Sequence, residues 1–119
     1  MAGIALPAYQ AYITRARLAE AMAVGKIATD SVASYYDQHR QLPNSLEQAG
    51  FAKSLPPSVK EISIDSQNGT VIITMATVPV EGKSLLLVPS VDANHKMIWQ
   101  CMSQDIPEKY LPHQCQQQK

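Results

Sequence analysis

The sequence predicts an α+β fold in which one long N-terminal α-helix packs on a four-stranded antiparallel β-sheet. Two observations support this fold class. A helical pattern fills residues 7–40 with a single internal glycine, and the period of the apolar residues changes to two after residue 60. A helix followed by a meander of strands gives one antiparallel sheet that the helix covers on one face. The length of 119 residues suits a single domain, expected over residues 1–119.

The helical unit is expected over residues 1–40, with the regular helix beginning at Pro7, because a proline loses no hydrogen bond in a first turn. Alanines and other good helix formers dominate the segment. Apolar and small residues recur every three or four positions and form the expected core face: Leu18, Met22, Gly25, Ala28, Val32 and Tyr35. Gly25 and Ala28 are small enough to let the sheet approach closely. The opposite side carries charged residues and is expected to face solvent.

Residues 41–60 are expected to form an irregular connection because three prolines interrupt them. One short helical turn is predicted inside this connection. Asn44 is its expected N-cap, with a glutamate three residues later, and Gly50 is its expected end. Leu46 and Phe51 are expected to anchor the connection to the core.

A meander of four strands is predicted over residues 61–102. Ile62 and Ile64 alternate with polar residues, and the next apolar run returns after a turn, which is typical of a hairpin. Turns rich in Gly, Asn and Asp are expected at 67–69, 80–83 and 92–94. The last three strands are expected at 70–77, 84–88 and 96–102.

The chain has only two cysteines, Cys101 on the last predicted strand and Cys115 near the C-terminus. In an exported protein such a pair forms a disulfide, which would fasten the tail to the sheet and stabilise the fold by about 3 kcal/mol. Two reduced thiols, or two ligands of a metal site, are the alternatives. The metal site has less support, because only His95 and His113 lie nearby in sequence and no CxxC spacing is present. We predict the disulfide.

Charge and motif content argue against an enzyme, and no cofactor is predicted. Ten basic and ten acidic residues give a formal net charge of zero, so no global field attracts nucleic acid or anionic lipid. The basic residues are scattered, which argues against a DNA-binding surface. His39, His95 and His113 fall on a helix end, a turn and the tail, without metal-binding spacing, and no glycine-rich phosphate loop is present.

Residues 1–14 carry no charge and are largely apolar. They are too short and too interrupted to span a bilayer, and they lack the basic flank and continuous apolar stretch of a secretory signal. The apolar pattern begins abruptly, so we expect that a preceding segment has been removed and that Met1 is an added initiator.

Three segments of the sequence resemble the type IVa pilins. The opening GIALPAYQAY (3–12), followed by TRAR (14–17), is similar to the end of the pilin assembly helix, where the apolar anchor passes into the amphipathic half. LPNSL (42–46) with AGF (49–51) resembles the start of the pilin αβ-loop. IWQC (98–101) and IPEKYLPHQC (106–115) resemble the last strand and the disulfide-bounded D-region, and this C-terminal similarity is the most specific.

The resemblance implies a division into the helix (1–40), the αβ-loop (41–60), the meander (61–102) and the D-region (101–115). Both loops lie on the outside of the fibre in that family. The D-region residues expected at the surface are Glu108, Lys109, Tyr110 and His113. The family's membrane-resident segment, with its N-methylated first residue and a glutamate used in assembly, would precede Met1.

The implied function is that of a structural subunit of an extracellular type IV pilus that supports adhesion, twitching motility or DNA uptake. The implied partners are other pilin subunits in a helical homopolymer, the inner membrane before assembly, and a surface or DNA ligand. The shortened chain itself is expected to be monomeric. Two alternatives stay open: a minor pilin acting as a DNA or surface receptor, and a pseudopilin of a type II secretion system.

Overall fold

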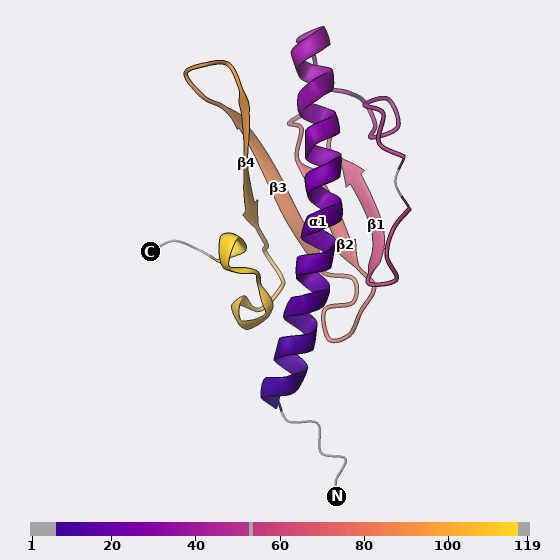
Figure 1. Cartoon of the computed structure of the whole chain (residues 1–119), viewed down its shortest axis with the longest axis vertical. Helices are drawn as coiled ribbons and strands as arrows, with labels where there is room; N and C mark the ends of the chain where they lie inside the picture. Colours follow the sequence, from indigo (N-terminus) through magenta and orange to yellow (C-terminus); the bar gives the residue numbers. More distant parts are fainter. Residues whose placement is uncertain (1–6, 53, 117–119) are drawn as a thin grey trace, which may run out of the picture.

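The protein folds as one long helix lying across one face of a four-stranded sheet (Figure 1). The computed structural model describes residues 7–52 and 54–116. Its elements are α1 (Pro7–His39), β1 (Val59–Ile64), β2 (Val71–Met75), β3 (Ser84–Val91), β4 (Met97–Met102) and two short 3-10 helices, η1 (Glu108–Tyr110) and η2 (His113–Cys115). The strand order is β1-β2-β3-β4 and every pair is antiparallel. The predicted fold class, a helix on an antiparallel meander, is confirmed.

The described helix runs over Pro7–His39 and ends one residue before the expected end. Arg40 adopts a left-handed backbone with φ of 55°, which stops the helix, while its N–H still donates to the Tyr36 carbonyl at 2.7 Å. The apolar opening Met1–Leu6, on which part of the pilin resemblance rests, lies outside the described residues.

Gly25 allows α1 to lie close to the sheet. A Cβ atom added at Gly25 would lie 2.7 Å from Ile73 Cδ1 of β2 and 2.8 Å from Leu87 Cδ1 of β3. Both distances are shorter than the ~3.5–4.0 Å of a favourable carbon–carbon contact. The space beside Gly25 is therefore already filled by side chains of the two central strands.

The buried residues of α1 form one stripe of small or branched side chains: Thr14, Leu18, Ala21, Val24, Gly25, Ala28, Thr29 and Val32. Two residues predicted for the core face, Met22 and Tyr35, are only partly buried. Met22 lies at the edge of the stripe that faces β4. Tyr35 lies near the end of the helix, where its ring centroid is 4.2 Å from that of His39.

The αβ-loop contains the expected helical turn, but its cap is Ser45 instead of Asn44. The Ser45 hydroxyl accepts from the Gln48 N–H at 3.1 Å, and the Gln48 side chain accepts from the Asn44 N–H at 2.6 Å. This pair of bonds resembles a capping box, except that the glutamine reaches one residue beyond the cap. Gly50, with φ of 93°, ends the turn. Leu46 and Phe51 are buried in the core on either side of it.

The strands follow the predicted order with small shifts at their ends. β1 begins at Val59, before the expected start of the meander, and β3 continues to Val91. In the β1–β2 hairpin the Gly69 N–H donates to the Asp65 carbonyl at 2.7 Å, and Gly69 has φ of 82°. The Val78–Pro79 peptide bond in the β2–β3 loop is cis.

Replacing Gly25 with leucine is expected to destabilise the protein by about 1–3 kcal/mol, because overpacking outweighs the gain in helix propensity. Ala23→Leu is the matched control, since Ala23 is exposed on the same helix. Chemical denaturation of both variants measures the effect. Equal unfolding midpoints for the two variants would show that the close contact at Gly25 is not structurally limiting.

Candidate functional site: the disulfide-bounded D-region

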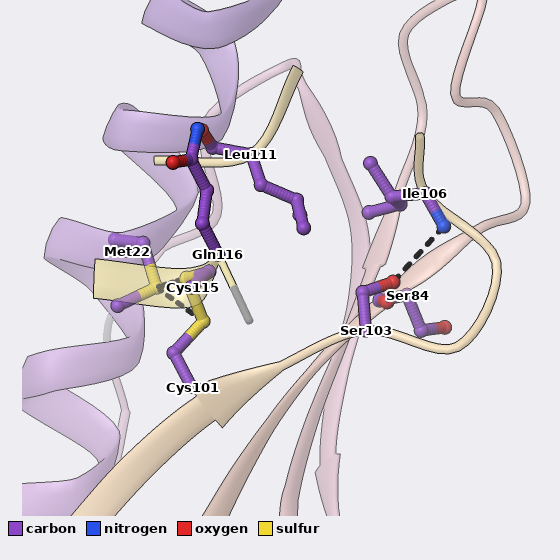
Figure 2. The surroundings of a disulfide bond; sticks show 8 residues. All are labelled: Met22, Ser84, Cys101, Ser103, Ile106, Leu111, Cys115 and Gln116. Carbon is purple, nitrogen blue, oxygen red and sulfur yellow. Dashed lines mark hydrogen bonds between the residues drawn. A yellow bond between two sulfur atoms is a disulfide. The ribbon is translucent and has the colours of Figure 1, made fainter. Parts of the chain in front are cut away.

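The D-region is closed by a disulfide between Cys101 of β4 and Cys115 of η2, whose Cα atoms lie 4.6 Å apart (Figure 2). The predicted pairing is confirmed, and the alternatives of reduced thiols or metal ligation are wrong. Both cysteines are buried, with 8% and 1% of their surface exposed. The bond therefore belongs to the core and holds the tail against the last strand.

Met22 of α1 packs directly on this disulfide (Figure 2). Its Sδ lies 3.6 Å from Cys101 Sγ and 3.8 Å from Cys115 Sγ. Because disulfide sulfurs carry no hydrogen, these are packing contacts between three polarisable atoms. Met22 thus joins the tail to the helix, a role that its predicted place on the core face did not reveal.

Ser103 fixes the start of the D-region to the end of the β2–β3 loop. Its hydroxyl donates to the Ser84 carbonyl at 2.7 Å and accepts from the Ile106 N–H at 3.0 Å (Figure 2). The Asp105 carboxylate accepts from the Ser84 N–H at 3.2 Å. These bonds turn the chain toward the core, where Ile106 and, farther on, Leu111 are buried with 6% and 4% of their surface exposed.

Arg15 provides a second link between the D-region and α1. Its guanidinium donates to the Lys109 carbonyl of η1 at 2.9 Å. The Lys109 ammonium lies 5.1 Å from the centroid of the neighbouring Tyr110 ring, within cation–π range. The Arg15 hydrogen bond therefore holds η1 against α1.

The D-region residues predicted for the surface differ in exposure. Glu108, Lys109 and His113 are exposed. Tyr110, also predicted for the surface, is partly buried and packs against the core.

A groove of about 490 Å³ lies between α1 and β4, beside the disulfide. Its lining mixes apolar and polar side chains: Met22, Lys26, Thr29, Asp30, Leu87, Ile98, Trp99, Gln100, Cys101, Gln114 and Gln116. Lys26 and Asp30 form an ion pair of 3.5 Å at its rim, and both side chains are more than half exposed. Such a surface pair contributes little to stability.

Among residues 7–52 and 54–116, no group of three or more His, Cys, Asp or Glu side chains could hold a metal ion. His39, His95 and His113 lie on α1, the β3–β4 turn and η2. Within the same described ranges, no helix has both the length and the apolar character needed to cross a membrane.

The contacts of Ser103 and Arg15 were not predicted from the sequence. The Ser103 contacts could have been found from the sequence, because a serine hydroxyl often accepts from backbone N–H groups two or three residues later. Here those N–H groups belong to Asp105 and Ile106. Arg15 carries no such local signal, because its partner carbonyl lies 94 positions away in sequence.

The fold is thus a long helix on an antiparallel meander with a C-terminal D-region closed by a disulfide. Residues 14–116 match the family model described as Pilin (bacterial filament). The chain belongs to the pilin family, and the resemblance to type IV pilins is confirmed.

Curated relatives agree with this assignment. A fimbrial protein of Neisseria meningitidis serogroup A is 37% identical over 92 residues, which cover 73% of this chain and 54% of that protein. The type IV major pilin protein PilE1 of Neisseria gonorrhoeae is 37% identical over 97 residues, covering 73% and 56%. The fimbrial protein EcpC of Eikenella corrodens is 30% identical over 122 residues, covering 97% and 78%. The chain thus spans about half the length of the two neisserial relatives.

Ser103→Ala is expected to lower the free energy of unfolding by about 1–2 kcal/mol, because the Ile106 N–H loses its hydroxyl acceptor. Ser90→Ala is the control, since Ser90 is exposed on β3, and should change stability by less than ~0.5 kcal/mol. Urea unfolding followed by tryptophan fluorescence provides the comparison. If Ser103→Ala unfolds at the same midpoint as Ser90→Ala, the hydroxyl does not hold the D-region in place.

Proposed function

We propose that this chain is the globular part of a structural subunit that polymerises into a type IV pilus. Before assembly, the full-length subunit would be held in the inner membrane by the preceding segment that the family resemblance implies. Adhesion, twitching motility or DNA uptake would be the outputs of the fibre. Within the fibre the D-region residues Glu108, Lys109, Tyr110 and His113 would face outward.

The observation that carries the proposal is the mismatch in length between α1 and the sheet. With 33 residues, α1 is about 50 Å long, whereas the eight residues of β3 span about 27 Å. The N-terminal turns of the helix therefore project beyond the strands (Figure 1). A helix that served only its own sheet would not need this extra length.

The projecting turns present aromatic side chains to solvent. Tyr9 and Tyr12 are 59% and 65% exposed, and Val78 of the β2–β3 loop is 72% exposed. Tyr9 and Val78 line a shallow hollow of about 370 Å³ together with Ile13 and Pro79. Clustered exposed apolar residues of this kind are typical of an interaction surface.

A helical fibre requires each subunit to offer two different faces, because repeated head-to-tail contacts do not close into a ring. The projecting end of α1 offers one face. The opposite flanks of the molecule, the αβ-loop on one side of α1 and β4 with the D-region on the other, supply further unlike surfaces (Figure 1). The asymmetry of the fold thus supports assembly into an open polymer.

Replacing both Tyr9 and Tyr12 with aspartate in the full-length protein is expected to abolish fibres while the folded domain still accumulates. The reason is that two charges would be placed in a contact that assembly must dehydrate. Immunogold electron microscopy of producing cells, with an antibody against this domain, measures fibre number and labelling density.

Val91→Asp is the control, because Val91 is also an exposed apolar residue, at 47%, but lies at the end of β3 away from the projecting turns. Fibres densely labelled along their length indicate a major subunit, and sparse labelling indicates a minor pilin. If wild-type cells form no labelled fibres but need this protein for protein secretion, the result would instead support the pseudopilin alternative. Normal fibres from the double variant would contradict the proposed assembly surface.

A further inference from the structure

The contact between Met22 and the disulfide suggests a role that packing alone does not require. Met22 Sδ lies within 3.8 Å of both cysteine sulfurs. Met22 also lines the groove between α1 and β4, which opens to solvent. The Met22 side chain is therefore partly exposed along the groove while its sulfur supports the buried disulfide.

We propose that Met22 is an oxidation site whose sulfoxide releases the D-region from α1. The oxidant is a peroxide: one oxygen atom is transferred to Sδ, the sulfur loses two electrons, and hydrogen peroxide is reduced to water. The product is a methionine sulfoxide, which sulfoxide reductases convert back. The disulfide keeps its bond, so the tail stays tethered while it loses its packing on the helix.

The expected consequence follows from polarity. A sulfoxide places a strong acceptor oxygen on a sulfur that packs against the disulfide, and burial of an unpaired polar group is costly. Oxygen added from the groove side makes the sulfur larger and more polar while it is packed 3.6 Å and 3.8 Å from the cysteine sulfurs, so the Met22 side chain is expected to shift toward the groove and away from the disulfide. The η2 segment, which contains Cys115, then loses the packing of Met22 on its disulfide.

The other methionines of the described residues allow the effect to be assigned. Met75 is fully buried in the core and should resist oxidation. Met97 and Met102 of β4 are partly exposed and should react, whereas the sulfur–sulfur contacts with the disulfide found within the described residues are those of Met22. Oxidation at β4 thus provides an internal reference in the same molecule.

The test treats the folded protein with hydrogen peroxide, maps sulfoxides by peptide mass spectrometry, and follows amide hydrogen exchange. The reporter amides are those of Leu111 and Cys115, which donate to Glu108 and Pro112 within the D-region. Their exchange is expected to quicken about ten-fold after oxidation, while the amide of Ile73 in β2 stays unchanged. Sulfoxide reductase should restore the original rates.

Two variants make the outcome decisive. Met22→Leu preserves volume and should fold normally, and its D-region should no longer respond to peroxide. The Met97→Leu/Met102→Leu double variant should respond as the wild type does. The proposal is overturned if Met22 escapes oxidation while Met97 and Met102 react, if the reporter amides do not quicken, or if they quicken equally in Met22→Leu. It concerns the folded domain alone, so its failure would leave the proposed assembly into a fibre untouched.

Discussion

The contact of Gly25 with the central strands sets the position of α1, and most other features depend on it. Ile73 and Leu87 reach into the space that a side chain at this position would occupy. The helix therefore lies close to the sheet in one orientation about its own axis. Rotating it would place a larger side chain in the space that Ile73 and Leu87 fill. That orientation directs Met22 toward β4 and the disulfide.

The D-region depends on this arrangement because it is a segment with little regular structure of its own. Its two short 3-10 helices are held by the disulfide, by the Ser103 hydroxyl and by the Arg15 guanidinium. Two of these three links rest on α1, since Met22 packs on the disulfide and Arg15 bonds to η1. One helix therefore both supports the surface segment and extends past the sheet as the proposed assembly element.

Features governed by local physics could be predicted from the sequence. The long helix ends one residue before the expected position, and turn residues separate the strands in the observed order. The disulfide could be predicted because the sequence has two cysteines and an exported protein would join such a pair. Features that depend on how distant segments meet could not be predicted: the contact of Met22 with the disulfide and that of Arg15 with the Lys109 carbonyl require the register of helix and tail. The cap was predicted at Asn44 but is formed by Ser45. When two residues that can cap a helix are adjacent, the sequence does not show which of them forms the cap.

Electron cryo-microscopy of fibres sheared from producing cells would show where α1 and the D-region lie in each subunit. We expect α1 of each subunit to lie at the fibre centre, with Tyr9 and Tyr12 in contact with helices of neighbouring copies. It also predicts that residues 101–115 lie at the outer surface and remain packed on α1 of their own subunit. A reconstruction in which the two tyrosines face solvent, or in which α1 is detached from its sheet, would contradict the account.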